Sequence, residues 1–453
     1  MNILEAIERS GVVGCGGAGF PTHAKLMSGV EYFIVNGVEC EPLLRTDRYI
    51  MRHFADKIIS AIERTGDEIG AVHCIIALKE SYSEEIHALR SAADAAKSRV
   101  SLHFLRSFYP AGDEQTIVYE VTGRVVPPAG IPLDVGCVVS NVATMLAVYD
   151  AISDRPLIHK YLTVSGEVET PTIADAPIGA PLESCLSLAG GASIDDYCVL
   201  LGGPMMGRII SKEEFPSMVV TKTMSGMIVL PQKSRLANIQ RMSREQMAVR
   251  ARASCIRCSQ CSQLCPRNLL GHPLEPHKIM RSLALCGDLQ ALPMNDAIVR
   301  SAALCCECGI CELIACPMDL QPRRVNAALR KMLAEAGIRY KKGDGQRSPH
   351  PFRDMRKIST VRAAARTGVY RFQHIRIDRL AEARPKRVIL PMSQHIGAPC
   401  EPLLRPGDEV KRGQLIASSP QGRLGSCIHA SIDGIVEIAS GSMTISSDGR
   451  RCN

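Results

Sequence analysis

Residues 255–266 read CIRCSQCSQLCP, and residues 305–317 read CCECGICELIACP. Each run places three cysteines at consecutive x2 spacing and a fourth directly before a proline. In two-cluster ferredoxins, this fourth cysteine ligates the other cluster. The sequence therefore predicts two 4Fe–4S clusters: the first bound by Cys255, Cys258, Cys261 and Cys316, and the second by Cys305, Cys308, Cys311 and Cys265.

Zinc is the rival metal for these cysteines. Structural zinc sites are usually built from paired C-x2-C units and need neither a third cysteine at the same spacing nor a following Cys-Pro. Because the full pattern occurs twice, it favours iron. The second run has one extra residue before Cys316, and Cys306 falls out of register, so we expect Cys306 to be a packed or idle thiol.

Composition narrows the class of protein. The chain has 453 residues, which predicts about three domains, and its 19 cysteines come without an apolar segment near the N-terminus. This combination indicates metal or redox chemistry and a cytoplasmic location. The longest apolar runs fall short of the roughly 18 residues expected of a membrane span.

Basic residues are dense between Arg323 and Arg387, within a net charge of +8. A nucleic-acid surface is disfavoured, because aromatic residues make up only 4% of the chain and no binding motif accompanies the charge. The remaining interpretations are a solvated basic linker and a docking surface for an acidic electron-transfer partner.

The rhythm of apolar segments predicts several domains. Short strands at 32–36, 72–78 and 100–105 alternate with helices at 47–64 and from Ser81 to about Lys97, which is typical of a parallel sheet covered by helices. Later segments predict a small α+β unit, a helical cysteine-rich unit, a basic stretch and an all-β tail. We expect an α/β domain at 1–159, a second domain at 160–232, a helical cluster domain at 233–338, a basic linker at 339–386 and a β module at 387–453.

A glycine-rich loop, GCGGAGFPT at 14–22, precedes Lys25. Glycines let backbone N–H groups approach a phosphate, and the lysine adds charge. A purely structural turn is the alternative. The loop is not a Walker motif, since no Gly-Lys-Ser/Thr follows.

Two further segments lie where α/β sheets place ligands. NGVECEP (36–42) follows the first strand, and YPAGDE (109–114) follows the third strand and opens a helix. Alternatively, Glu39 and Glu41 face water, and Asp113 and Glu114 only favour the start of that helix.

Together, GCGGAGFPTHAK, NGVECEP, YPAGDEQ, GGPMMG (202–207) and both cysteine runs resemble the flavin-binding subunit family of respiratory complex I. They resemble the RnfC component of the Rnf electron-transport complex still more closely. The tail is similar to the RnfC barrel-sandwich module, but follows the clusters. This order, the chain length and CCECGICELIACP resemble the cobalamin reductases of propanediol-utilisation microcompartments. The resemblance implies a multidomain α/β protein with a Rossmann-like FMN/NADH domain, an SLBB-type β-grasp domain, a helical dicluster domain and a C-terminal barrel-sandwich module.

The same resemblance implies non-covalent FMN and NADH as electron donor, with no side chain acting as a catalytic acid or base. The implied flavin contacts are Gly14, Gly16, Gly17, Gly19, Lys25, Asn36, Tyr109, Gly112, Asp113 and Asn141. Phe20, Glu41 and Glu114 match nucleotide-contacting positions, and Glu39 belongs to the same cofactor-binding set. Val38 and Ser140 differ from the complex I pattern, and 124–136 lacks the lysine and phenylalanine that help to hold NADH there.

The implied activity is NADH-dependent electron transfer through FMN and two clusters to cobalamin, in coenzyme B12 recycling during 1,2-propanediol degradation. A flavin suits this task because it exchanges electrons both in pairs and singly. Implied partners are a corrinoid adenosyltransferase and microcompartment shell proteins, with the protein inside the microcompartment. The alternatives are a respiratory component of the RnfC type and a relay module without NADH chemistry of its own.

Overall fold

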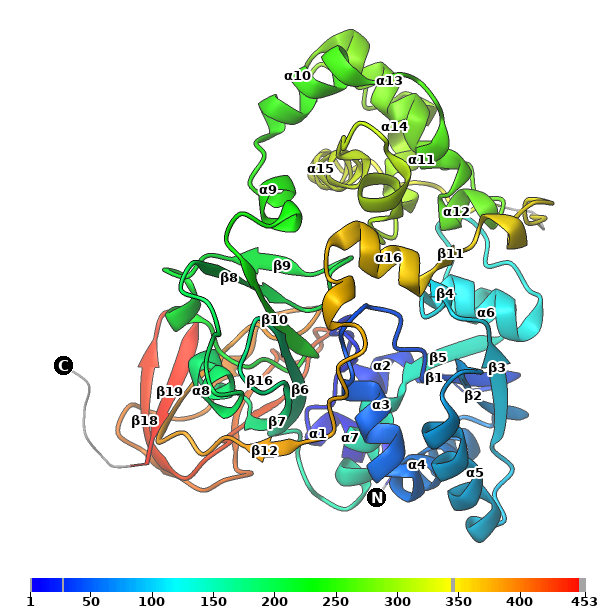
Figure 1. The fold of residues 1–453 in the computed structure, drawn as a ribbon. Helices are drawn as coiled ribbons and strands as arrows, with labels where there is room; N and C mark the ends of the chain where they lie inside the picture. Colours follow the sequence, from blue (N-terminus) through cyan, green and yellow to red (C-terminus); the bar gives the residue numbers. More distant parts are fainter. Residues whose placement is uncertain (1, 27, 344–346, 448–453) are drawn as a thin grey trace.

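The structure is a computed structural model that describes residues 2–26, 28–343 and 347–447. A helical module lies at one end of the molecule, and three β-containing units form the other end (Figure 1). Within the described ranges, no helix is long and apolar enough to cross a membrane.

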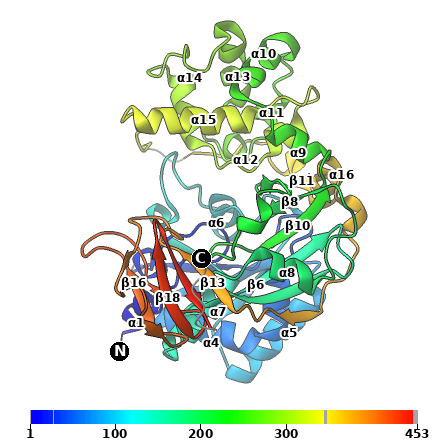
Figure 2. The ribbon, with the colours of Figure 1, turned by 90° about the vertical axis from the view of Figure 1, so that its left-hand side faces the viewer.

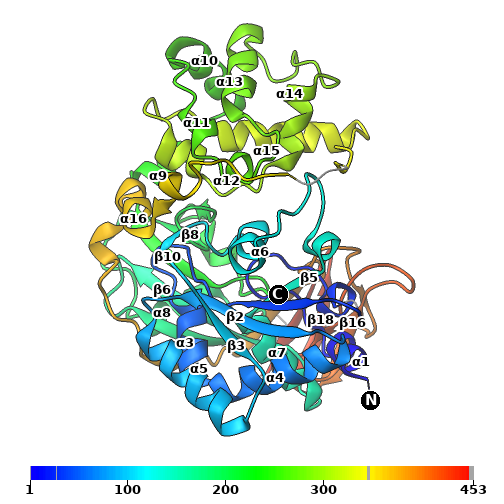
Figure 3. The ribbon, with the colours of Figure 1, turned by 90° about the vertical axis from the view of Figure 1, so that its right-hand side faces the viewer.

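The N-terminal unit is built on a four-stranded parallel sheet in the order β3-β2-β1-β5. Alternate side chains of β1 face opposite sides, so Phe33 and Val35 join one hydrophobic core while Ile34 joins another. Figure 3 shows α4 and α5 on one side of this sheet and α6 on the other. The strands are β1 (Tyr32–Asn36), β2 (His73–Lys79), β3 (Ser101–Leu105) and β5 (Cys137–Asn141).

Helices cover both faces, as buried parallel sheets require. One helix expected at 47–64 is instead two helices that meet at Phe54, whose φ of −133° is not helical. The helix expected from Ser81 begins two residues later, at Ser83. The helices are α1 (Ile3–Arg9), α2 (Thr22–Lys25), α3 (Thr46–His53), α4 (Ala55–Glu68), α5 (Ser83–Ala96), α6 (Glu114–Thr122) and α7 (Val142–Ile152).

The second unit is a six-stranded mixed sheet in the order β12-β7-β6-β10-β8-β9, and α8 (Leu182–Leu188) packs against β7. Its own apolar core contains Leu162, Val199 and Phe215. The strands are β6 (His159–Gly166), β7 (Thr172–Pro177), β8 (Tyr197–Leu201), β9 (Arg208–Ile210), β10 (Gly226–Pro231) and β12 (Leu380–Glu382).

The helical module holds both cysteine runs and a separate core that includes Ile279, Leu283, Val325 and Leu329. Ser243 caps α10 with a capping box, and Asp296 caps α14. The helices are α9 (Arg235–Gln240), α10 (Arg244–Ser254), α11 (Gln260–Gln263), α12 (Pro266–Leu269), α13 (Pro276–Cys286), α14 (Ala297–Arg300) and α15 (Pro322–Glu335).

The stretch expected as a basic linker contacts the N-terminal unit, the six-stranded sheet and the helical module. β11 (Ile358–Ser359) pairs with β4 (Phe108–Tyr109), α16 (Thr360–Thr367) follows it, and β12 extends the six-stranded sheet. Part of its charge is used in ion pairs, because Arg353 and Lys357 both bind Glu120 of α6. The segment therefore holds the units together through strand pairing and ion pairs.

The tail forms two small antiparallel sheets, in the orders β13-β19-β18-β15 and β14-β16-β17. Its apolar side chains, including Val388 and Ile445, join the core that also contains α4 and α7. Figure 2 shows these strands beside α1 and α7. They are β13 (Arg387–Pro391), β14 (Glu401–Pro402), β15 (Glu409–Val410), β16 (Leu415–Ser418), β17 (Ile428–His429), β18 (Gly434–Ala439) and β19 (Ser442–Ser446).

Candidate flavin and iron–sulfur sites

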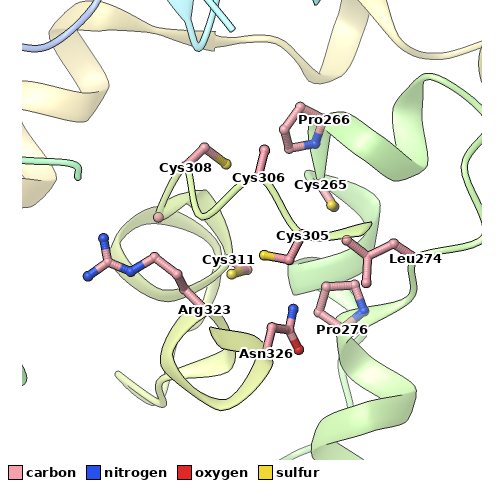
Figure 4. A pocket seen from close by; sticks show the side chains of 11 residues that line it. Cys265, Pro266, Leu274, Pro276, Cys305, Cys306, Cys308, Cys311, Arg323 and Asn326 are labelled. Atoms are coloured by element: carbon pink, nitrogen blue, oxygen red, sulfur yellow. The ribbon is translucent and has the colours of Figure 1, made fainter. Parts of the chain in front are cut away.

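Four predicted ligands of the second cluster line one pocket. Figure 4 shows Cys305 and Cys308 on one loop, Cys311 on the helical turn that follows it, and Cys265 approaching from the start of α12. Pro266 and Asn326 complete part of the wall. The out-of-register Cys306 lines the same pocket, so this thiol is not remote from the site.

The predicted ligands of the first cluster also lie together. The thiols of Cys255, Cys258 and Cys316 are close enough to Cys261 to raise its pKa, although burial is the larger cause. Cys258 is exposed, and Cys255 and Cys261 are half-buried. The two quartets therefore differ in their access to solvent.

Both runs fold with the same backbone pattern. Arg257 and Ser259 flank Cys258 with left-handed φ angles of 57° and 60°, and Glu307 and Gly309 flank Cys308 with φ angles of 55° and 81°. When left- and right-handed backbone conformations alternate, successive N–H groups point into one shared hollow. Such a hollow can bind an anionic sulfide or thiolate. Three non-glycine residues accept this costly conformation, as expected at a functional site.

The extra residue of the second run has a local explanation. Residues Ile310–Ala315 form a π-helical turn that contains Cys311 and ends directly before Cys316, whereas the first run uses the short α-helix α11. A π turn is wider by one residue than an α turn. The insertion is therefore absorbed before Cys316, and its sulfur still accepts a hydrogen bond from the Leu320 N–H at 3.3 Å.

Burial raises the pKa of Cys261 to about 12 and that of Cys305 to about 11. It also raises the pKa values of Cys265 and Cys311 above their ordinary value. Thiols in such surroundings stay protonated unless a cation offsets the buried charge. Iron binding would therefore displace protons from these sites and stabilise the module.

The glycine-rich loop lies beside the carboxyl ends of β1 and β5. Its backbone is closed by bonds from Gly14 N to Phe20 O and from Gly19 N to Gly14 O, at 2.9 and 3.0 Å. Gly16 and Gly17 are exposed. A Cβ at Gly16 would lie 3.0 Å from the Asn141 side chain, whereas one at Gly17 would meet no described atom within 4 Å. The loop thus presents an open, side-chain-free surface.

Asn36 and Asn141 connect this loop to the segment around Gly112. Asn36 Nδ2 donates to Gly112 O at 2.9 Å, and Asn141 Nδ2 donates to Asn36 O at 3.4 Å. An added Cβ at Gly112 would lie 2.7 Å from Val38 O. Close backbone approach therefore requires glycine here, and the structure brings these predicted residues together.

Lys25 and Glu114 form an ion pair at 2.5 Å across the same region. Both side chains are partly exposed, so the pair can open toward a ligand at little cost. Phe20, which closes the glycine-rich loop through its carbonyl, is half-buried.

Asp113 and Tyr109 face the helical module. Both Asp113 carboxylate oxygens accept from Arg267, at 2.6 and 2.9 Å, and one also accepts from Thr116 N at the start of α6. These contacts hold the pKa of Asp113 below its usual value despite burial. The buried Tyr109 hydroxyl donates to Cys308 O at 2.7 Å. The two residues thus tie the flavin-side unit to the second cysteine run.

Glu39 is buried beneath the site at the start of α3, near the N–H groups of Asp47 and Arg48. Burial and the nearby Asp47 raise its pKa to about 8. Asp47 also accepts from Asn141 Nδ2 at 2.8 Å. The Glu39 side chain therefore does not face water, the alternative considered from the sequence.

Glu41 points at the GGPMMG turn of the second unit. Its Oε2 accepts from Met205 N at 2.8 Å, while its buried Oε1 has no hydrogen-bond partner within the described ranges. Burial raises its pKa to about 7. Met205 O in turn accepts from Arg323 at 2.7 Å, which joins the turn to α15.

No role was predicted from the sequence for Arg267, Asp47, Met205 or Arg323. Arg267 directly follows Cys265-Pro266, and a residue next to a cluster ligand is expected to be buried. A buried arginine needs a carboxylate partner, so a partner for Arg267 could have been expected. Nothing in the sequence indicated which carboxylate would supply it.

Four family models match along the chain: a Nuo51 FMN-binding domain at 7–150, an SLBB domain at 161–209, a 4Fe–4S dicluster domain at 254–321 and an RnfC barrel sandwich hybrid domain at 375–451. The chain is 39% identical to cobalamin reductase PduS of Citrobacter freundii, over 98% of this chain and 96% of the relative. The chain belongs to the PduS cobalamin reductase family. It is a multidomain oxidoreductase with an FMN-binding domain and a 4Fe–4S dicluster domain.

More distant relatives share part of this organisation. The RnfC-type component of the ion-translocating oxidoreductase complex of Vibrio cholerae is 33% identical over 63% of this chain, but only 36% of its own length is covered. A crystal structure of NAD+-reducing nickel–iron hydrogenase in the H2-reduced state has a TM-score of 0.50 at 20% identity, covering 75% of this chain and 63% of that one. This likeness concerns the fold alone. The whole-chain match to PduS favours that family over the RnfC proteins.

Proposed function

We propose that this protein is an NADH-dependent cobalamin reductase that takes a hydride from NADH and passes single electrons to a corrinoid. The observation that carries the proposal is the direct connection between the flavin-side residues and the second cysteine run, through Asp113–Arg267 and Tyr109–Cys308. These bonds join the site that would accept a hydride to one that accepts single electrons.

The residues fit both cofactor types. Gly17 is exposed with open space where a Cβ would stand, and Gly16 and Gly112 let Asn141 and Val38 pack closely, so the loop offers bare backbone of the kind that non-covalent FMN would need. When bound, FMN supplies the conversion between two-electron and one-electron transfer. The repeated concave backbone and eight cysteines in two quartets suit two 4Fe–4S clusters. Asp113 and Tyr109 would set the position of the second run relative to the flavin.

NADH binding is assigned to the open side of the glycine loop. The buried Glu41 Oε1 lacks a partner within the described ranges, and a buried carboxylate oxygen is expected to have one. A nucleotide hydroxyl would supply it. Glu39, Glu114 and Phe20 complete the proposed contacts, and the Lys25–Glu114 pair would open when phosphate binds Lys25.

The acceptor is assigned from the family, whose members carry the name cobalamin reductase. Reduction of Co(III) towards Co(I) takes two successive single electrons. Cluster potentials reach about −700 mV, low enough for a cluster to donate them. By the same family membership, we assign the protein to the propanediol-utilisation microcompartment, with a corrinoid adenosyltransferase and shell proteins as partners.

The proposal includes the type of each domain and its bounds. We assign a Rossmann-like domain to 1–159, a β-grasp domain to 160–232, the dicluster domain to 233–338 and the barrel-sandwich module to 387–453.

The test is an anaerobic assay with reconstituted protein, NADH and hydroxocobalamin. NADH should bleach the flavin and cluster absorption, and the cobalamin spectrum should change as Co(II) forms. No turnover with any corrinoid, despite bleaching, would overturn the acceptor. Absence of bleaching by NADH, with normal reduction by dithionite, would favour the relay module without NADH chemistry.

A further inference from the structure

The two cysteine quartets lie at different depths. Cys308 and Cys311 are buried against the flavin-side unit, whereas Cys258 is exposed and Cys255 is half-buried. An electron that enters next to Tyr109 therefore reaches the inner quartet first and the outer quartet last. The surface around Cys258 is the natural exit.

Large apolar side chains are exposed beside this outer quartet. Ile256, between Cys255 and Cys258, is 61% exposed, and Met318, two residues after Cys316, is 38% exposed. A hydrogen bond from Arg250 to Met318 O at 3.2 Å ties α10 to the same surface. These two side chains offer apolar contacts to a partner that approaches the outer quartet.

The charge around these side chains is basic. Residues 244–261 carry four arginines and one acidic residue, Glu245. Arg257, in the cysteine loop, and Arg252, whose guanidinium lies beside Gly287 at the end of α13, are both exposed. Neither forms an ion pair within residues 2–26, 28–343 and 347–447. Around the inner quartet, in contrast, Arg267 and Arg323 are paired with Asp113 and Glu312.

We propose that the outer cysteine loop, with Ile256 and Arg257 on it, Met318 beside it and Arg252 on the preceding turn of α10, docks an acidic protein that accepts electrons one at a time. An apolar centre with an arginine rim is a composition favoured at protein interfaces. Unpaired arginines would steer an acidic partner to this face. The inference rests on the proposed function, because it requires a filled outer cluster. Each transfer moves one electron from the reduced outer cluster to the partner, with no bond made or broken.

The test uses holoprotein reduced by dithionite, with excess reductant removed, and two one-electron acceptor proteins of opposite charge: an acidic flavodoxin and a basic cytochrome c. Arg252→Glu should slow flavodoxin reduction roughly tenfold at low salt, and the difference should shrink as salt screens the charges. Cytochrome c reduction should become faster. Arg257→Glu should show the same pattern once normalised to iron content.

Arg423→Glu is the matched control, because Arg423 is an exposed arginine on the C-terminal tail and its reversal changes net charge equally. It should leave both rates near wild type. Equal slowing by Arg252→Glu and Arg423→Glu would overturn the proposal, as would an unchanged flavodoxin rate in Arg252→Glu. NADH bleaching is recorded separately. If it fails in the wild-type protein, the proposed function loses its donor while the dithionite experiment still decides the docking surface.

Discussion

The two cysteine runs share a backbone pattern and differ in almost everything around it. The first run lies at the surface beside arginines that have no ion-pair partner in the described part of the chain, with Cys258 exposed. In the second run Cys308, Cys311 and Cys316 are buried, and Gly309 packs so closely on the GGPMMG turn that an added Cβ would lie 2.7 Å from Met205 O. The same local motif thus serves two positions in a relay: an inner one fixed by contacts and an outer one left accessible.

This contrast shows that cysteine spacing specifies only the ligand loop. The inner position is created by partners from other units, namely Asp113, Tyr109 and Met205. Mutations at matched positions of the two runs should therefore have unequal effects, in the following order.

The largest effect is expected from loss of an inner ligand. Cys308→Ser should reduce iron from about eight to about four atoms per chain. It should also abolish NADH-driven reduction of the outer cluster, because the relay is cut at its inner position. Anaerobic iron analysis and electron paramagnetic resonance after NADH addition measure both.

Two control variants sharpen this result. Cys258→Ser should lose the outer cluster but keep NADH-driven reduction of the inner one. Cys306→Ser should keep about eight irons, since this thiol is outside both quartets. Retention of full iron by Cys308→Ser together with loss in Cys306→Ser would show that the quartet is assigned wrongly.

The next largest effect concerns the buried pair Arg267–Asp113. Arg267→Ala removes the only cation that the described residues pair with the buried Asp113 carboxylate, which keeps its bonds from Thr116. Breaking a buried ion pair typically costs about 3–5 kcal/mol. Unfolding in denaturant, monitored through the release of flavin, should measure this loss of stability. The exposed pair Arg330–Glu307 in the second run is the matched control, and Arg330→Ala should cost at most about 1 kcal/mol. Equal losses would mean that burial at Arg267 is not decisive.

Gly309 and Ser259 occupy equivalent left-handed positions after the middle cysteine of each run. Gly309→Ala should destabilise the protein by about 1–2 kcal/mol from backbone strain and add a clash with Met205 O. Ser259→Gly should be neutral or slightly stabilising, because it relieves the same strain. Thermal unfolding measures both. Destabilisation by Ser259→Gly of the same size would contradict the left-handed assignment.

The smallest effect is expected for Tyr109→Phe, which removes the hydroxyl that donates to Cys308 O. Loss of one such bond costs about 0.5–1.5 kcal/mol. The electron paramagnetic resonance signal of the inner cluster should shift while that of the outer cluster stays unchanged. A change confined to the outer signal would reverse the assignment of inner and outer quartets.

Local features of this protein could be predicted from its sequence, whereas long-range contacts could not. The strands and the cysteine spacing can be read from short stretches of sequence, and the strands expected at 32–36 and 100–105 are present. The π turn at Ile310–Ala315 resolves a one-residue insertion that spacing alone left open.

The failures concern residues whose partners lie far along the chain. Arg267 meets Asp113 across 154 positions, and the 339–386 stretch contributes a strand to β7. The Arg267–Asp113 ion pair and the pairing of β12 with β7 both form only when separate units of the protein pack against each other. Neither composition nor periodicity encodes that docking.

The electron relay requires that two quartets of cysteines each hold a 4Fe–4S cluster within reach of a bound flavin. Quantitation of iron, acid-labile sulfide, zinc and FMN in protein purified under argon tests this requirement directly. We expect about eight irons and eight sulfides per chain, one FMN and no zinc. A colourless protein, or one that holds zinc in place of iron, would show that the relay does not exist.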